Sequence, residues 1–127
     1  MDQAKKNKEF IISYFNSLGG VPKTRESMAQ FMDDPALVEH ILFFESVFPC
    51  YEVFADEMMA EGNKVFVRGR FKGRHEGDFN GTPPTFRQVE FPFAIGYEIE
   101  NEKIIHHWLI ADQATLMEQL GLTGVLA

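Results

Sequence analysis

The stretch Val89-Glu90-Phe91-Pro92-Phe93-Ala94-Ile95-Gly96-Tyr97-Glu98-Ile99 carries an apolar or aromatic side chain at every second position. This alternation is typical of a β-strand that buries one face. Shorter runs of the same kind predict strands at 51–60, 64–73 and 103–111, and turn-forming residues separate the first two and the last two of the four strands. The second half of the chain therefore predicts a mainly antiparallel sheet.

Helical patterns fill the first half of the chain. Apolar residues in 5–18 recur with the spacing of one helical face, and Gly19-Gly20 follows as an end signal. Thr24 is a candidate N-cap for a short second helix, and Asp34-Pro35 is a start signal for a third. A last helix is predicted at 113–120, after the final strand.

Length and composition fit this order of elements. A chain of 127 residues with 45% hydrophobic residues is long enough for one domain with a core or a single cavity. Helices followed by an antiparallel meander predict an α+β fold spanning residues 1–127, in which the N-terminal helices pack on a curved sheet around an internal pocket. Thirteen phenylalanines indicate a thick core or an aromatic pocket lining.

Charge and hydropathy exclude several classes of partner. The net charge of −7 argues against nucleic acid, whose affinity comes mainly from Lys and Arg on phosphates. No apolar stretch approaches the ~20 residues that a membrane helix needs, and the N-terminus has no secretory apolar core. The single Cys50 cannot form an internal disulfide. We therefore expect a cytoplasmic protein that binds neither nucleic acid nor membrane.

The segment 73–85 is rich in turn-forming residues and too long for a tight hairpin. Loops of this length in a compact domain are often lids or binding loops. A solvated hairpin connection that its prolines make rigid fits the composition about as well.

Several motifs occur in a characteristic order. They are Glu61-Gly62-Asn63-Lys64-Val65, Arg68, Gly73-x-His75-x-Gly77-x-Phe79-x-Gly81-x-Pro83-Pro84-Thr85, Glu98-Ile99-Glu100-Asn101-x-Lys103-Ile104, His107-Trp108-x-x-x-Asp112 and Gln119-Leu120-Gly121. In this order they resemble the SnoaL-like polyketide cyclase branch of the NTF2-like superfamily, typified by the nogalonic and aklanonic acid methyl ester cyclases. The helical half also looks similar, through Asp34-Pro35, His40 and Phe48-Pro49.

The resemblance implies an α+β cone with an apolar pocket, a homodimer and no cofactor. In the true cyclases of this family one aspartate is the general acid/base of an intramolecular aldol closure. It lies where the His-Trp-x-x-x-Asp pattern ends, which here is Asp112. Phe86 stands where the family often has a small residue, and we expect it to narrow the pocket and to disfavour a bulky polycyclic substrate.

Asp112 can be a base only if its pKa is raised, which desolvation by apolar neighbours would do. Regular alternation along the last strand places Asp112 on one face with Trp108 and Ile110, which would form an apolar wall. Asp112 also fits a simpler role, because an aspartate directly before a helix is a favoured N-cap. The two roles are compatible at the rim of a pocket.

The histidines are further candidates. Alternation turns His106 toward the pocket and His107 outward, whereas the family resemblance favours His107, and a bulge would exchange the two. Adjacent histidines on a strand cannot chelate one metal ion in the usual manner, and no zinc-binding spacing is present, so we predict no metal site. His75 is a candidate to orient a carbonyl group or to assist Asp112.

Other residues are candidates for contact with a ligand. Arg68 and Arg87 can bind a carbonyl or anionic oxygen if they face the cavity. The aromatic side chains at Trp108, Phe91, Phe93 and Tyr97 are either core or pocket wall, and a buried tyrosine hydroxyl needs a hydrogen-bond partner.

Two functions remain open. One is a cofactor-free enzyme in which Asp112 catalyses an intramolecular aldol-type cyclisation or an isomerisation of a small, largely apolar carbonyl compound. The other is a non-catalytic small-molecule-binding protein with the same fold, because this fold serves both purposes. Apolar positions such as Ile105 and Leu109, expected on the outer face of the sheet, indicate a dimer interface.

Overall fold

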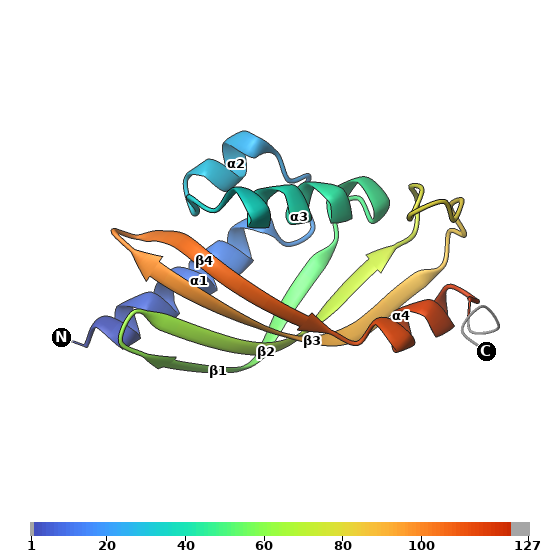
Figure 1. Cartoon of the computed structure of the whole chain (residues 1–127). Helices are drawn as coiled ribbons and strands as arrows, with labels where there is room; N and C mark the ends of the chain where they lie inside the picture. The colour runs from blue at the N-terminus through green and yellow to red at the C-terminus, as the bar shows by residue number, and fades with distance from the viewer. Residues whose placement is uncertain (1, 123–127) are drawn as a thin grey trace.

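A computed structural model describes residues 2–122 of the chain. Three helices precede a four-stranded antiparallel sheet in the order β1-β2-β3-β4, and a short helix follows it (Figure 1). The elements are α1 (Gln3–Leu18), α2 (Arg25–Ala29), α3 (Pro35–Val47), β1 (Glu52–Glu61), β2 (Lys64–Arg74), β3 (Gln88–Glu100), β4 (Lys103–Ala111) and α4 (Gln113–Gln119). The α+β fold predicted from the sequence is confirmed.

Each helix begins at a residue whose side chain satisfies a free backbone N–H group. Asp2, Asp34 and Asp112 cap α1, α3 and α4, and Thr24 forms a reciprocal capping box with Ser27 at α2. Pro35 occupies the first turn of α3, where its missing N–H group costs nothing. The caps at Thr24, Asp34 and Asp112 are the start signals that the sequence predicts, whereas α1 begins two residues before the predicted residue 5, at the cap Asp2.

The sheet curves around the helical layer. α1 packs on β1 and β2, and α4 packs on β3. Figure 1 shows α2 and α3 lying together above the sheet, with α4 continuing past the end of β4. Along β3 the side chains at Phe91, Phe93, Ile95, Tyr97 and Ile99 are all buried, as the alternation predicts. The core therefore lies between this face of the sheet and the helices.

A β-bulge in β4 changes which side chains face the core. Glu98 pairs with His106 and Ile99 pairs with Ile104, so Ile105 has no partner on β3. The extra residue shifts the alternation by one position. After the bulge, His106 and Trp108 face the outer side of the sheet, and His107 and Leu109 face the helices. The regular alternation assumed for this strand is therefore wrong, and Leu109 does not lie on the outer face.

The long loop after β2 is docked on the end of α3. The N–H groups of Glu76 and Gly77 both donate to the carbonyl oxygen of Val47, at 2.9 and 3.0 Å. Gly77 permits this approach, because a Cβ atom there would overlap the carbonyl oxygen of Ser46. His75 is fully buried and its Nδ1 accepts the Thr85 N–H at 3.1 Å. The beginning of the loop is therefore held against α3 by these contacts and does not extend freely into solvent.

No helix within residues 2–122 has the length and apolar character needed to cross a membrane.

Candidate functional site

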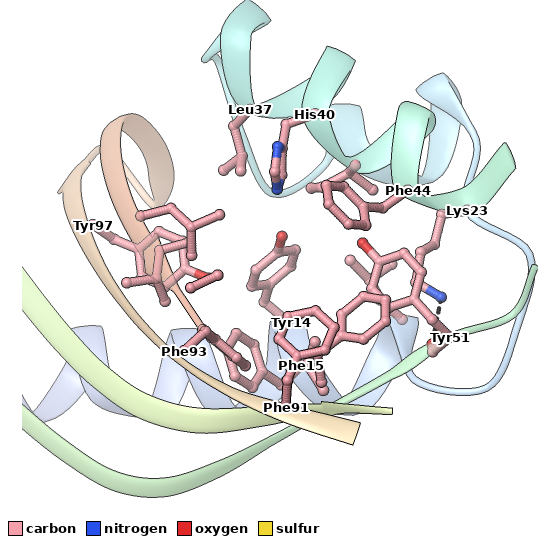
Figure 2. A pocket seen from close by; sticks show the side chains of 17 residues that line it. Tyr14, Phe15, Lys23, Leu37, His40, Phe44, Tyr51, Phe91, Phe93 and Tyr97 are labelled. Carbon is pink, nitrogen blue, oxygen red and sulfur yellow. Dashed lines mark hydrogen bonds between the residues drawn. The ribbon is translucent and has the colours of Figure 1, made fainter. Parts of the chain in front are cut away.

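A cavity lies between the concave face of the sheet and the helices α1 and α3 (Figure 2). The volume open to the centres of water-sized molecules is about 80 Å³. One ordered water needs roughly 10–15 Å³ on this measure, so the cavity has room for several waters or for one small organic molecule. Its walls are mainly aromatic and aliphatic side chains from α1, α3 and all four strands.

All three tyrosines of the chain line this cavity. Tyr14 comes from α1, Tyr51 from the start of β1 and Tyr97 from β3, and each is at most 7% exposed. Figure 2 shows the hydroxyl groups of Tyr14 and Tyr51 directed into the space. No hydrogen bond within residues 2–122 involves any of the three hydroxyl groups, and none of them is among the side-chain atoms there that are buried without a partner, so the hydroxyls face space that a solvent-sized molecule can reach. Because a buried phenol normally finds a partner, the three hydroxyls are available to a molecule inside the cavity.

Burial raises the pKa of all three phenols above the ordinary value for tyrosine. The hydroxyl groups therefore remain protonated near neutral pH and can donate hydrogen bonds. The rings of Tyr14 and Tyr97 meet edge to face, with centroids 6.1 Å apart. The cavity thus offers neighbouring neutral donors in an otherwise apolar wall.

His40 is the histidine of the cavity lining. It lies on α3 with its ring 4.7 Å from the ring of Phe44, one turn further along the helix. Figure 2 shows the ring extending from α3 into the part of the cavity toward which the Tyr14 hydroxyl points. Burial lowers the pKa of His40, and the nearby His107 lowers it further. Neither ring nitrogen of His40 forms a hydrogen bond with a group in residues 2–122.

Lys23 closes one end of the cavity. Its ammonium group donates to the carbonyl oxygens of Tyr51 and Val21, at 2.8 and 3.0 Å, and lies 3.5 Å from a carboxylate oxygen of Glu45. It also sits 4.0 Å from the centre of the Tyr51 ring. Burial lowers the pKa of Lys23, and the charge of Glu45 opposes this effect. Through its hydrogen bond to the Tyr51 carbonyl oxygen and its contact with the Tyr51 ring, Lys23 fixes the position of Tyr51.

A largely buried hydrogen-bonded pair, Asp34 and His107, lies beside the cavity. Asp34 caps α3 by accepting the Leu37 N–H at 3.2 Å, and its other carboxylate oxygen lies 2.7 Å from Nδ1 of His107. The side chains are 8% and 15% exposed, respectively. This pair joins the beginning of α3 to β4, and so it fixes the helix that carries His40.

Asp112 lies outside the cavity lining. Its carboxylate accepts the N–H of Thr115 at 3.0 Å and the hydroxyl of Thr115 at 2.7 Å. Both hydrogen bonds favour the ionised form, and they lower the pKa of Asp112. The expected apolar wall is absent because Trp108 and Ile110 face the outer side of the sheet. The expectation of a raised pKa is therefore wrong.

The other predicted site residues are divided between the two sides of the sheet. Phe91, Phe93 and Tyr97 line the cavity. His106 and Trp108 lie together in a shallow groove on the outer face, next to Phe66. The indole of Trp108 lies directly over Gly96, where a Cβ atom would collide with it.

The remaining candidates also lie away from the cavity. Arg68 forms an exposed ion pair with Glu57 at 2.7 Å, and Arg87 lies 3.5 Å from the carbonyl oxygen of Gln119. His75 holds the long loop, and its Nε2 is buried without a partner among the described residues. Phe86 is 56% exposed and does not narrow the cavity, contrary to expectation.

Sequence reasoning missed Tyr14, Lys23, His40 and Tyr51 as site residues. Tyr14 follows the apolar stripe of α1 and was therefore assigned to the core. A usable signal was present, because a tyrosine within an otherwise apolar stripe brings a hydroxyl that needs a partner. In the described part of the chain, no cluster of three His, Cys, Asp or Glu side chains could hold a metal ion.

Comparison with known proteins was made at the level of sequence and of structure. The family model described as SnoaL-like polyketide cyclase matches residues 36–120. No curated protein sequence matches the chain.

Solved structures share the fold at low sequence identity. A candidate SnoaL-like polyketide cyclase from Jannaschia sp. CCS1 is 19% identical with a TM-score of 0.80, covering 94% of this chain and 96% of its own. A SnoaL-like polyketide cyclase from Agrobacterium tumefaciens is 19% identical with a TM-score of 0.74, covering 91% and 98%. A phenazine biosynthesis-related protein from Pseudomonas aeruginosa is 19% identical with a TM-score of 0.71, covering 93% and 86%.

Proposed function

The chain belongs to the SnoaL-like polyketide cyclase family, and from this premise we propose that its cavity binds one small, mainly apolar carbonyl compound. The observation that carries the proposal is that three tyrosines with buried rings line one apolar cavity, and that no hydrogen bond within residues 2–122 uses their hydroxyl groups. A ligand oxygen that accepts from one of them replaces a missing hydrogen bond, while the rest of the ligand replaces water against aromatic walls.

The size of the cavity sets the size of the ligand. About 80 Å³ of free volume favours a compact ring compound over a long polycyclic chain. The size of the cavity is limited by the aromatic rings of its wall, such as those of Phe71 and Phe91, which stack with their centroids 4.8 Å apart. Phe86 is not part of this wall.

Catalysis is the second part of the family's expected function. An aldol-type cyclisation or isomerisation through Asp112 remains a prediction from the sequence. The hydrogen bonds that hold Asp112 and lower its pKa make it a weaker base than the predicted role needs. The binding function does not depend on Asp112.

A matched pair of ligands tests the binding function. Indane and 2-indanone have nearly the same shape, but only the ketone can accept a hydrogen bond. We expect the protein to bind 2-indanone more tightly, and Tyr14→Phe to weaken that binding about two- to tenfold, the range for one neutral hydrogen bond. Binding of indane should be unchanged by the substitution. Isothermal titration calorimetry measures all four affinities, and equal binding of both ligands to the unmodified protein would contradict the proposal.

We also propose that two copies of the chain pair through the outer face of the sheet. Met59, Phe66, Gly96 and Trp108 form one row across the four strands, and Ile110 lies in the next row. Met59 is 71% and Ile110 is 69% exposed in the single chain. The row of Ile110 also carries the exposed ion pair of Arg68 and Glu57, which would lie at the rim of the apolar side chains. Exposed apolar side chains gathered on one face usually mark an interface.

Solution mass tests the pairing. Analytical ultracentrifugation at micromolar concentration should give a dimer, and Trp108→Glu should shift it to a monomer because a carboxylate is costly to bury there. Phe86→Ser removes another exposed aromatic side chain, which lies away from this face, and should leave the dimer intact. A monomeric mass for the unmodified protein would contradict this proposal.

A further inference from the structure

Five residues of the cavity lining carry a side chain that can exchange or donate a proton, and they are Tyr14, Lys23, His40, Tyr51 and Tyr97. The roles of four are limited by their surroundings. The three phenols stay protonated, so they are hydrogen-bond donors and not bases near neutral pH. The ammonium of Lys23 donates to the carbonyl oxygens of Val21 and Tyr51 and lies 3.5 Å from Glu45, and a protonated ammonium group has no lone pair with which to take a proton.

His40 differs from the other four. Its ring faces the cavity, and no hydrogen bond from residues 2–122 occupies either ring nitrogen. A neutral imidazole has one nitrogen with a free lone pair and one that carries a proton. His40 can therefore take a proton from a bound molecule and return it, without first breaking a contact within the protein.

We propose that His40 is the general acid/base of this cavity, and that it enolises a small bound ketone whose carbonyl oxygen accepts a hydrogen bond from a tyrosine hydroxyl. This proposal rests on the binding function proposed above and identifies the reacting group within it. Tyr14 is the donor that Figure 2 shows pointing toward His40.

The proton transfer is balanced without any further reactant. The free nitrogen of His40 takes a proton from the carbon next to the carbonyl group. The electron pair of that C–H bond forms a carbon–carbon double bond, and the carbonyl pair moves onto oxygen, where the tyrosine hydroxyl stabilises the negative charge. The imidazolium then returns the proton to carbon, or to the alkoxide formed if the enolate carbon attacks a second carbonyl of the same molecule.

The surroundings of His40 favour its neutral form. Tyr14 faces it from α1, Tyr97 lies across the cavity on β3, and His107 approaches from β4 with Asp34 as its partner. Burial and the neighbouring His107 both disfavour a proton on His40, so the base is ready near neutral pH. An imidazole is in any case a weak base, because its ordinary pKa is only about 6.5.

The weakness of this base restricts the substrate class. A weak base removes a proton at a useful rate only from an acidified C–H group, because proton transfer becomes slower as the acid and base differ more in strength. We therefore infer that the substrate carries its reactive C–H group between two carbonyls, or between a carbonyl and an aromatic ring. 2-Indanone has the second arrangement and serves as the probe.

Deuterium exchange of 2-indanone in D₂O, followed by proton NMR, tests the inference. We expect the protein to accelerate exchange at the carbons next to the carbonyl, and His40→Gln to reduce the protein-catalysed rate at least about tenfold, within the range that a general base contributes. The dissociation constant for 2-indanone should change less than about tenfold, because one neutral hydrogen bond is the most that the substitution could remove. The rate should rise with pH through one ionisation below the ordinary pKa of histidine and then level off.

His106→Gln is the matched control, because it changes a histidine on the outer face of the sheet, and it should leave the rate unchanged. His40→Phe is a second variant that keeps an aromatic ring next to Phe44. Full exchange activity in both His40 variants would overturn the inference, as would binding of 2-indanone without any acceleration of exchange. Failure to bind 2-indanone at all would instead overturn the proposed binding function, and this inference with it.

Discussion

Three helices of this protein begin at an aspartate, and two of these residues, Asp34 and Asp112, differ in what their second oxygen does. In both, one carboxylate oxygen accepts the backbone N–H three residues later, Leu37 for Asp34 and Thr115 for Asp112. The second oxygen of Asp34 binds His107 on β4, whereas that of Asp112 accepts the hydroxyl of Thr115 within its own helix. Asp34 is buried, and Asp112 is partly exposed.

The difference shows which of the two helix starts matters for the cavity. Asp112 satisfies only its own helix α4, so its contacts are local. Asp34 connects α3 to the sheet, and α3 carries His40 over the cavity. An aspartate that caps a helix can therefore be structural in one place and a positioning residue in another, depending on the partner of its second oxygen.

The largest effect is expected for Asp34→Ala. The substitution removes the cap of α3 and leaves His107 buried without its partner. Loss of a cap costs about 1 kcal/mol, and an unpaired buried polar group costs about 1–3 kcal/mol, so the free energy of unfolding should fall by roughly 2–4 kcal/mol. Urea denaturation measures this loss.

Asp34→Asn separates the two contributions. Asparagine is as good an N-cap as aspartate, but its amide has no charge to pair with His107. We expect a smaller loss of stability than for alanine, together with a clear loss of 2-indanone exchange if the position of α3 sets that of His40. An unchanged stability for Asp34→Ala would remove the distinction between the two helix starts.

Much of the fold could be predicted because its determinants are local. The alternation in 89–99 requires only that one face of one strand be buried, and the start of α3 requires only Asp34 and Pro35. The orientation of β4 is not local. It depends on Ile105 being left unpaired against β3, a property of two strands together that no run of residues in β4 reveals.

The cavity was harder to predict than the sheet because it too depends on how distant parts of the chain are arranged. Tyr14 and His40 each fit an apolar helical face, and such residues usually fill a core. Whether they instead surround a hollow depends on the distance that the curved sheet keeps between α1 and α3. Sequence patterns report burial, but they do not report the space left between buried side chains.

A smaller loss of stability than for Asp34→Ala is expected for Asp112→Ala. It removes a cap from a seven-residue helix at a partly exposed position, so the loss of stability should be less than half of that for Asp34→Ala. Exchange of 2-indanone should continue at the rate of the unmodified protein, because no contact of Asp112 reaches the cavity. Abolished exchange in a folded Asp112→Ala protein would restore the catalytic role that the sequence resemblance implies, and would contradict the role proposed for His40.

The pH dependence of the stability lost in Asp112→Ala tests whether the hydrogen bonds from Thr115 to the Asp112 carboxylate are its cause. Hydrogen bonds from Thr115 lower the pKa of Asp112 in the folded protein, so its carboxylate stabilises the fold fully above the ordinary aspartate pKa of about 4. That stabilisation is lost as the pH falls through the lowered folded value. The stability difference between the unmodified protein and Asp112→Ala should therefore stay constant from neutral pH to about pH 5 and shrink below about pH 4. A difference that disappeared near neutral pH would instead mean a raised pKa, and Asp112 would then be a base after all.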